Sequence, residues 1–139
     1  MTTTAYNKPL PVPSPVSREF WAAARRHEFV LQRCRSCQQY IHYPRAACPH
    51  CLSQDLGWAP ASGRGTVYSY TVARRPTASV FADVTPYVIA IVELEEGVRM
   101  TTNIVGCPPE EVRIGMPVEA VFDDVTDDVS LIRFRPGRQ

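Results

Sequence analysis

The chain has 139 residues, of which 45% are hydrophobic and 21% are charged, and its formal net charge is +1 at pH 7. This length suits one compact domain or two very small ones, and the near-neutral charge excludes a globally basic nucleic-acid-binding protein. The charge is uneven, because residues 1–51 hold seven basic and two acidic side chains whereas residues 52–139 hold eight basic and twelve acidic ones. The basic half contains the predicted helix and metal site, where four thiolates around one divalent ion would leave about two negative charges to balance.

Residues 1–16 are predicted to form a proline-rich N-terminal arm. Its alternating prolines favour an extended, polyproline-like conformation, either disordered or laid on a neighbour. We expect no signal peptide, because residues 1–15 lack an apolar core. The longest apolar run, residues 87–92, is far too short to span a bilayer. The sequence therefore predicts a cytoplasmic protein without a membrane partner.

Residues 17–29 are predicted to form an N-terminal helix. Ser14 followed by Pro15 gives a helix-start signal, and Ser17 is the alternative cap. A helix of about three turns cannot bury its apolar face alone, so we expect it to pack on the rest of the chain, on a partner or on a ligand. Core packing is the favoured role for its two aromatic residues. The predicted face consists of Phe20, Ala23, Ala24 and His27, with Trp21 beside them.

Four cysteines form two C-x2-C pairs separated by ten residues, namely Cys34 with Cys37 and Cys48 with Cys51. Two such turns facing each other supply four soft ligands in the tetrahedral arrangement of a structural zinc site. Buried cysteines or disulfides are the alternative, which the regular spacing and the expected reducing compartment disfavour. Iron in a rubredoxin-like site is the chemical rival. A closed four-cysteine site has no open coordination position, so we expect the metal to hold structure rather than to catalyse.

Residues 30–62 are predicted to form a rubredoxin-like zinc ribbon, with short strands at 28–33, 40–43 and 56–58 around the two cysteine turns. Gly63 and Gly65 mark a hinge to the next module. Residues 63–139 then show the alternation of β-strands. Five strands are expected, with a hairpin turn at residues 95–97 between the second and third and one helical turn between the third and fourth. This order is typical of an OB-fold barrel. The five strands are 66–74, 87–95, 98–105, 118–123 and 129–134.

The second barrel strand is apolar on both faces, with Val88, Ala90, Val92 and Leu94 on one and Tyr87, Ile89 and Ile91 on the other. One face must fill the barrel, and the other must be covered by the helix, a subunit or an acyl chain. An OB-fold that binds single-stranded nucleic acid instead displays aromatic and basic side chains on its second and third strands. The third strand carries one basic residue, Arg99, so this alternative function is disfavoured, although Arg74 and Arg75 keep it open.

The chain shows no convincing catalytic constellation. Cys107 is the one cysteine outside the ribbon, and a nucleophilic cysteine needs a nearby base or a lowered pKa. The three histidines, His27, His42 and His50, all lie in the predicted helix or ribbon. His50 is expected to be a surface residue or a neighbour of the ligands rather than a ligand. The carboxylates of residues 123–128 are expected to form a solvated turn.

Several segments together resemble one known family. They are Leu31-Gln-Arg-Cys34, Cys37 and the second cysteine pair with Pro44-Arg45, Gly63-Arg-Gly-Thr-Val-Tyr-Ser-Tyr-Thr71, Pro86-Tyr-Val-Ile-Ala-Ile-Val92 with Gly97-Val98, and Ile114-Gly-Met-Pro-Val118. From about Ser17 to its C-terminus the chain resembles the zinc-ribbon plus OB-fold family associated with acyl-CoA metabolism, long catalogued as domain-of-unknown-function family thirty-five. The combination is specific, whereas a zinc ribbon alone would not be.

This resemblance implies a mainly β fold with an N-terminal helix, a rubredoxin-like zinc ribbon and a five-stranded OB-fold barrel. It also implies a non-catalytic accessory subunit in a hetero-oligomer. The implied partner is a thiolase, a hydroxymethylglutaryl-CoA-synthase-like condensing enzyme, an acyl-CoA hydratase or an aldolase that shortens sterol side chains.

Such a subunit can also contribute to binding of the acyl-CoA itself. Coenzyme A needs cationic groups for its phosphates and an apolar channel for its pantetheine and acyl parts. A solvated surface is an equally favoured role for the arginines. The candidates for the charge are Arg25, Arg26, Arg74 and Arg75, and those for the channel are Phe20, Trp21 and Tyr70.

Overall fold

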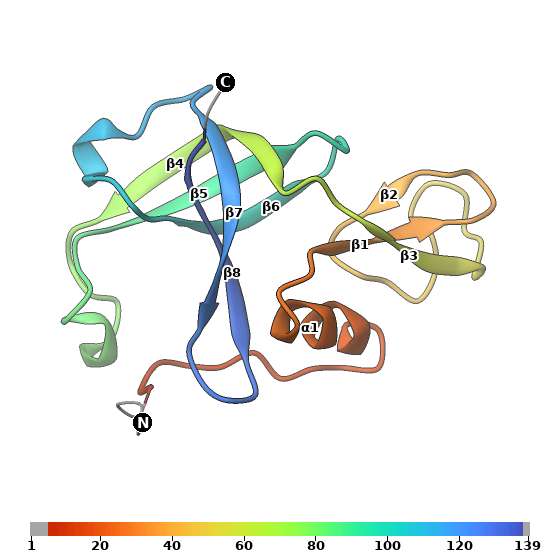
Figure 1. The fold of residues 1–139 in the computed structure, drawn as a ribbon, viewed down its shortest axis with the longest axis horizontal. Coiled ribbons are helices and arrows are strands. Elements are labelled where there is room, and N and C mark those ends of the chain that lie inside the picture. The colour runs from red at the N-terminus through yellow and green to blue at the C-terminus, as the bar shows by residue number, and fades with distance from the viewer. Residues whose placement is uncertain (1–5, 138–139) are drawn as a thin grey trace.

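The computed structural model describes residues 6–137 and places a short helix and a three-stranded sheet beside a closed five-stranded barrel (Figure 1). The helix α1 spans Arg18–Arg25. The ribbon sheet has the order β2-β1-β3 and is antiparallel. Its strands are β1 (Val30–Cys34), β2 (Tyr40–Ile41) and β3 (Leu56–Pro60). No helix in the described part of the chain is long and apolar enough to cross a membrane.

The barrel has the strand order β4-β5-β6-β8-β7, which confirms the predicted OB fold. A single 3₁₀ turn, η2 (Pro109–Glu111), lies between the third and fourth strands, as predicted. A second 3₁₀ turn, η1 (Ser79–Phe81), lies in the long β4–β5 connection and was not predicted. The strands are β4 (Arg64–Ala73), β5 (Tyr87–Leu94), β6 (Arg99–Ile104), β7 (Pro117–Asp124) and β8 (Ser130–Pro136).

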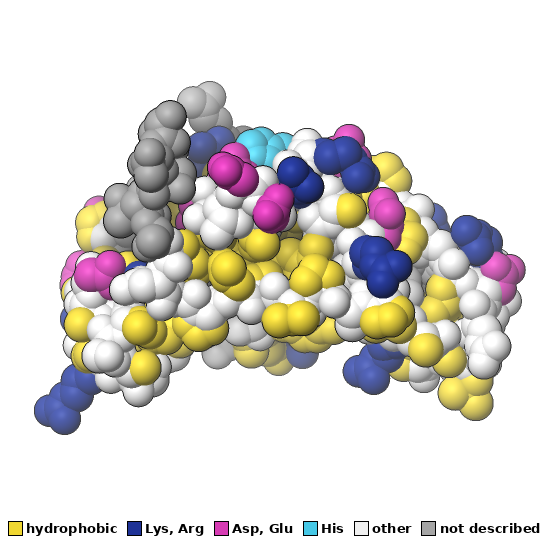
Figure 2. Space-filling model, turned by 90° about the horizontal axis from the view of Figure 1, so that it is seen from below, with side chains coloured by type: hydrophobic (Ala, Val, Ile, Leu, Met, Phe, Trp, Pro, Cys, Tyr) yellow, Lys and Arg dark blue, Asp and Glu magenta, His cyan; other side chains and the backbone are white. Residues whose placement is uncertain are grey.

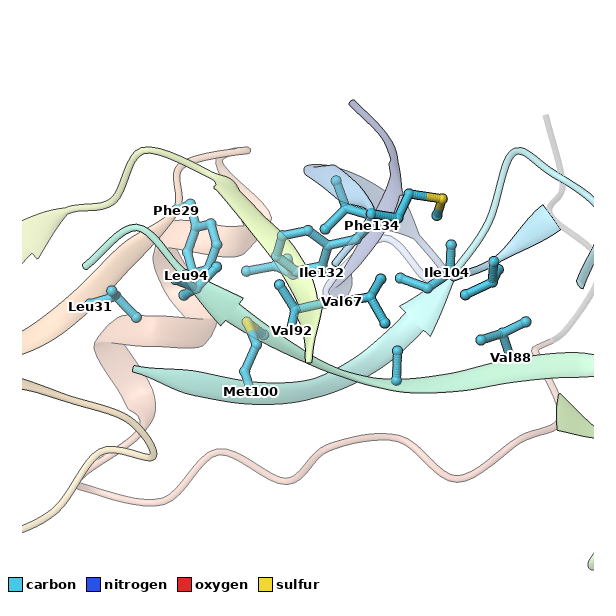
Figure 3. Packing of buried hydrophobic residues seen from close by; sticks show 14 of the residues in the cluster. Phe29, Leu31, Val67, Val88, Val92, Leu94, Met100, Ile104, Ile132 and Phe134 are labelled. Carbon is cyan, nitrogen blue, oxygen red and sulfur yellow. The ribbon is translucent and has the colours of Figure 1, made fainter. Parts of the chain in front are cut away.

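One hydrophobic core joins the three parts of the molecule. Phe29 and Leu31 point from the segment around β1 toward Leu94 at the end of β5, and the ring of Phe29 lies 6.4 Å from that of Phe134 in the barrel (Figure 3). On the other side, the ring of Phe20 in α1 lies 6.5 Å from Phe29. Helix, ribbon and barrel therefore share buried side chains.

The helix is shorter than the sequence predicts. It ends at Arg25, and His27 has a left-handed backbone with φ of 62°. A left-handed residue cannot continue a right-handed helix, so the chain turns toward β1 there. Phe20, Ala23 and Ala24 form the buried face as expected. His27 does not, because its side chain is 51% exposed.

Gly65 lies inside β4, paired with Leu94 on one side and Val118 on the other, so it is part of the barrel and not a hinge. A Cβ atom at this position would meet the backbone carbonyl of Glu93. Gly63 does have the left-handed conformation, with φ of 78°. The two glycines thus serve the entry into the barrel in different ways, one by its backbone angle and one by close strand approach.

Candidate metal centre and adjoining groove

The two cysteine pairs lie in turns with the same local geometry. The N–H of Gln38 donates to the carbonyl of Cys34 at 2.9 Å, and the N–H of Leu52 donates to the carbonyl of Cys48 at 2.9 Å. Gln38 and Leu52, each directly after the second cysteine of its pair, both have a φ of 67°. The C-x2-C spacing therefore folds twice into one turn type, which presents its two sulfurs on one side.

The four sulfurs converge with the dimensions of a tetrahedral metal site. The Sγ atoms of Cys34 and Cys51 are 3.6 Å apart, those of Cys37 and Cys48 are 3.7 Å apart, and all four lie within 4.8 Å of one another. Metal–sulfur bonds of about 2.3 Å at tetrahedral angles require sulfur separations of about 3.8 Å. The predicted cluster can therefore hold a metal ion, and its donor set suits zinc or iron. With four sulfur ligands, such an ion would fasten the two turns together.

Backbone N–H groups donate hydrogen bonds to two of the four sulfurs. The N–H of Cys37 points at Cys34 Sγ at 3.4 Å, and this bond is the main cause that lowers the pKa of the Cys34 thiol to about 6. Burial and the neighbouring sulfurs raise the pKa of Cys37 and Cys51, so the thiolate is favoured at Cys34 first. The N–H of His50 points in the same way at Cys48 Sγ, at 3.3 Å. His50 contributes its backbone here, and its side chain is exposed. Amide donors favour the thiolate form that a metal requires.

The ribbon loop is fastened to its surroundings by side chains. The buried amide of Gln32 donates to the Arg45 carbonyl and accepts from the Arg45 N–H, both at 2.8 Å. The Tyr43 hydroxyl accepts the N–H of Thr101 in β6 at 3.1 Å. Burial lowers the pKa of His42 to about 4, so this ring is neutral where it packs between the loop and α1. The loop therefore has a fixed position beside the barrel.

A groove follows the seam between β6 and β8. These strands share a single parallel bridge, between Ile104 and Phe134. The other neighbouring strands of the barrel pair over several residues each. Beside this seam lie two cavities of about 630 and 360 Å³. Their linings share three residues, so the two cavities adjoin, and together they are called the groove below. The shared residues are Asn103, Leu131 and Arg133.

Each end of the groove is built from distant parts of the chain. The larger cavity is lined by Tyr6 and Lys8 of the arm, by the β4–β5 connection, and by strand residues near the β6 and β7 ends. The smaller cavity is lined by Phe20 and Trp21 of α1, by the ribbon loop and by Met100 of β6. The arm also contributes two residues to the smaller cavity, namely Ser14 and Val16.

A polar network crosses the middle of the otherwise largely apolar groove. Arg133 donates to Asp123 at 2.7 Å and to the side-chain oxygen of Asn103 at 2.6 Å. Asn103 in turn donates to the carbonyl of Val88 at 2.9 Å. The Arg133 side chain is 20% exposed, so its charge is compensated within the groove floor.

Two of the predicted contact residues lie in this groove and five do not. Phe20 and Trp21 line the smaller cavity, with ring centroids 5.1 Å apart in an edge-to-face arrangement. Tyr70 packs against the barrel core instead. Arg74 and Arg75 are exposed after the end of β4, without an acidic partner among the residues that the structure describes.

Arg25 and Arg26 are engaged with acidic side chains of this chain. Arg25 lies 3.5 Å from Asp128, and Arg26 lies 3.5 Å from Glu19 and 3.2 Å from Glu28. All five side chains are largely exposed, so these pairs are weak. Neither arginine lines the groove.

The acidic segment 123–128 is not the purely solvated turn that the sequence predicts. Asp124 accepts a hydrogen bond from His27 at 2.8 Å, and the His27 ring stacks on Phe122 with centroids 5.1 Å apart. This bond lowers the pKa of Asp124. The β7–β8 hairpin is thereby fastened to the end of α1, together with the Arg25 pair described above.

No nucleophile–base pair is assembled within residues 6–137. Cys107 lines the larger cavity, but burial and then the nearby Glu111 raise the pKa of its thiol, which disfavours the nucleophilic thiolate. No histidine lines that cavity in the described chain. His42, which lines the smaller cavity, is neutral and packed between aromatic rings.

The two faces of β5 have different surroundings. The predicted inner face fills the barrel, as Val88, Ala90, Val92 and Leu94 are buried. On the outer face, Ile91 is 36% exposed. Nearby, Arg99 of β6 lies over the ring of Tyr68 at 3.7 Å and pairs with Glu93 at 3.2 Å. This basic residue is therefore engaged, and an apolar strip remains on the outer face.

Sequence reasoning missed the residues at the centre of the groove, Asn103, Leu131 and Arg133, and also Lys8 of the arm. Asn103 and Arg133 occupy outward positions of strands whose inward residues are buried. That alternation alone predicts a solvent-facing role, and nothing local indicates that the two strands meet. The one available signal was that β6 and β8 each carry a polar residue, Asn103 and Arg133, on the outward face.

The fold and the sulfur cluster define a protein with a rubredoxin-like ribbon and an OB barrel, and comparison with known proteins agrees. Residues 21–57 match the family model described as the ChsH2 rubredoxin-like zinc ribbon domain. Residues 58–123 match the model of the ChsH2 C-terminal OB-fold domain. The chain belongs to this family, also known as DUF35, which confirms the resemblance seen in the sequence.

Three relatives illustrate the family. A "DUF35 domain-containing scaffold protein" of Methanothermobacter thermautotrophicus is 40% identical over 75% of this chain and 78% of its own length. A "probable enoyl-CoA hydratase alpha subunit" of Thermomonospora curvata is 44% identical over 85% of this chain, which spans 37% of that longer protein. A solved structure titled "Ltp2-ChsH2(DUF35) aldolase" is similar with a TM-score of 0.83 and 40% identity, covering 91% of this chain and 98% of the other.

Proposed function

We propose that this protein is a non-catalytic accessory subunit that docks on an acyl-CoA enzyme and helps to enclose that enzyme's acyl-CoA. The observation that carries the proposal is the groove along the β6–β8 seam. It is a formed, mostly apolar channel in a chain whose described residues assemble no catalytic pair. Such a chain can shape a site without performing the chemistry.

The names of the relatives support the class of partner. One is named a probable enoyl-CoA hydratase alpha subunit, one structure is titled an Ltp2-ChsH2(DUF35) aldolase, and one is named a scaffold protein. The partner of this chain is accordingly an aldolase, hydratase, thiolase or related condensing enzyme that acts on an acyl-CoA. Docking would complete the partner's substrate tunnel or hold its active-site loops closed.

The dimensions of the groove suit the acyl part of such a ligand. Ligand pockets in proteins commonly enclose about 300–1,000 Å³ with mainly apolar walls and a few polar groups, and the larger cavity has about 630 Å³. Phe20 and Trp21 extend the apolar wall at the other end. Arg74 and Arg75 are the better candidates for the phosphates, because Arg25 and Arg26 already have acidic partners.

The metal centre has a structural role in this proposal. Cys34, Cys37, Cys48 and Cys51 would hold one zinc ion, with iron as the chemical alternative. When bound, the ion supplies cross-links between the two turns. The ribbon then holds its loop, with Tyr43, against β6 at one wall of the groove.

The proposal is tested by co-expressing the protein with the aldolase-, hydratase- and thiolase-type subunits of its native organism, one at a time. We expect one subunit to co-elute, and its turnover of an acyl-CoA to depend on this chain. Trp21→Asp should abolish both effects while zinc content stays at one per chain. Ile114→Asp, at a 63% exposed position away from the groove lining, is the matched control and should change neither.

Two results would refute the proposal. One is that each subunit elutes separately with an unchanged rate, and the other is that this chain alone turns over an acyl-CoA. Calorimetric titration with a long-chain acyl-CoA, with and without the co-eluting subunit, separates ligand binding from scaffolding. Heat in neither condition would remove the acyl-CoA contact and leave the docking role.

A further inference from the structure

The burial of the arm repeats with a period of three residues. Lys8, Pro11 and Ser14 are partly buried, whereas the residues between them are exposed. A polyproline II helix has three residues per turn, so every third side chain lies on the same face. This pattern indicates a polyproline II segment that lays one face on the body of the protein. The outward residues are Pro9, Leu10, Val12 and Pro13.

The sequence enforces this conformation. Proline fixes its own φ near −65° and restricts the preceding residue to extended angles. Because Pro9, Pro11, Pro13 and Pro15 alternate with other residues, both kinds of restriction apply along the whole segment. The segment also belongs to no helix or strand. The arm is thus stiff before it meets any partner.

Both ends of the segment are anchored to the body. At one end, Lys8 pairs with Asp83 of the β4–β5 connection at 3.1 Å, and its side chain is only 10% exposed. At the other end, the N–H of Ser14 donates to the Ser17 hydroxyl at 2.9 Å, just before α1. At about 3.1 Å per residue, the six steps from Lys8 to Ser14 span roughly 19 Å.

The arm crosses the lower side of the molecule in Figure 1, between the N-terminal end and α1. Seen from below, hydrophobic side chains gather across the middle of this side (Figure 2). Within the arm, Val12 is 88% exposed and Leu10 is 40% exposed. The outward residues Pro9, Leu10, Val12 and Pro13 carry no charge. Together with the outward prolines, these two side chains form an uncharged apolar face on the surface of the described structure.

We propose that residues 9–13 are a preformed polyproline II ligand for an aromatic-lined groove on the acyl-CoA enzyme subunit to which this protein docks. The inference rests on the proposed function, and it identifies the arm as a segment that contacts the partner enzyme. Tyr and Trp side chains pack between successive ridges of a polyproline II helix, and their O–H and N–H groups donate to its solvated carbonyls. Because the arm is already ordered, binding loses little conformational entropy.

The neutral, apolar character of the outward face selects this kind of partner. A charged surface, such as nucleic acid or an anionic membrane, would gain nothing from Pro9, Leu10, Val12 and Pro13, since attraction to phosphates needs basic side chains. The one cation of the segment, Lys8, faces the body and is paired. The arm therefore fits an aromatic protein groove.

The test compares dissociation constants for the subunit that co-elutes with the wild-type protein. Val12→Asp should raise the dissociation constant at least tenfold, and Ile114→Asp, also at an exposed aliphatic position, should leave it unchanged. A synthetic peptide of residues 6–17 should compete with the full chain. The same peptide with glycine in place of every proline should compete at least tenfold more weakly, because it must be ordered on binding. Zinc content and circular dichroism establish that both variants are folded.

The outcomes distinguish this inference from the proposed function. If Val12→Asp binds as tightly as wild type, or if the glycine peptide competes equally well, the arm is not the contact, while the accessory role stands. If Val12→Asp instead abolishes self-association and leaves the enzyme subunit bound, the arm joins copies of this chain and the inference is wrong. If the wild-type protein binds none of the three enzyme types, both fail.

Discussion

Removing the ribbon metal should weaken the barrel as well as the ribbon. The reason is that Phe29 and Leu31, on the segment leading into Cys34, are buried in the same core as the barrel side chains. Without four sulfur–metal bonds the two cysteine turns lose their cross-link, and a small metal-dependent ribbon is unfolded in its absence. When the ribbon unfolds, Phe29 and Leu31 would leave the core together with β1.

The size of the effect follows from their burial. Leu31 is fully buried and Phe29 is 8% exposed. Burying an apolar side chain of this size stabilises a protein by about 1.5–3 kcal/mol, so losing both costs the barrel about 3–6 kcal/mol. Domains have a total stability of about 5–15 kcal/mol. Each 1.4 kcal/mol is a factor of ten, so amides that exchange through barrel opening should exchange about a hundred to ten thousand times faster.

Hydrogen exchange of the amides in β5 is the measurement, because Val88 to Leu94 lie in the barrel and far from the sulfurs in sequence. We compare metal-loaded wild type, chelated wild type and Cys48→Ser. Cys107→Ser is the control, since Cys107 lies outside the sulfur cluster and should leave exchange unchanged. If β5 stays equally protected after chelation, the barrel is stable by itself and the shared-core reasoning is wrong.

Three further changes have defined outcomes. The His27 bond lowers the pKa of Asp124, so this carboxylate stabilises the fold above its unfolded pKa of about 3.9, and the contribution disappears as pH falls through the lower folded value. Asp124→Asn should therefore flatten the decline of the urea unfolding midpoint below about pH 4. An unchanged acid profile would contradict this. Gly65→Ala should destabilise the protein by about 1–3 kcal/mol in thermal unfolding, because the new Cβ would meet backbone atoms. Gly57→Ala, whose Cβ would meet the end of a flexible arginine side chain, should destabilise it less. Equal losses of stability would refute the argument. Arg133→Met should lower stability by about 1.5–3 kcal/mol through loss of two charge-assisted hydrogen bonds, and an unaltered midpoint would show that the network contributes nothing.

The metal cluster could be predicted because its signal is local. A C-x2-C pair fixes two sulfurs within one turn, and the structure shows both turns closed by the same bond, to the carbonyl of Cys34 in one and of Cys48 in the other. The barrel order was also predictable, since β5, β6 and β8 alternate between buried and more exposed residues and the hairpin turn at Gly97 has the expected left-handed conformation. These features depend on neighbours within a few residues.

The groove and the contact between His27 and the β7–β8 hairpin could not be predicted, because they depend on contacts that no local pattern specifies. Asp124 and His27 are 97 positions apart, and Arg133 and Asn103 are 30 apart. The sequence shows an acidic turn and an alternating strand, and each has a simpler role in solvent. Closure of the barrel along the β6–β8 seam brings Asn103 and Arg133 together, and packing of the end of α1 on the β7–β8 hairpin brings His27 and Asp124 together. The length of α1 was overestimated for a similar reason, because His27 contacts the hairpin and does not continue the helix.

A shared core also links metal binding to docking. The arm is anchored beside α1, and α1 packs on Phe29, so the surfaces proposed for docking depend on the region that the metal holds together. A partner that binds only the folded form stabilises that form by mass action. Reciprocity then requires that partner binding strengthens metal retention by the same factor by which metal strengthens partner binding. A competition titration with a chromophoric chelator, with and without the co-eluting subunit, measures one side of this cycle, and the partner's dissociation constant before and after chelation measures the other. We expect the two factors to agree and to exceed ten. A factor of one on both sides would show that the ribbon metal and the docking surfaces are independent, and the shared core would then be structural only.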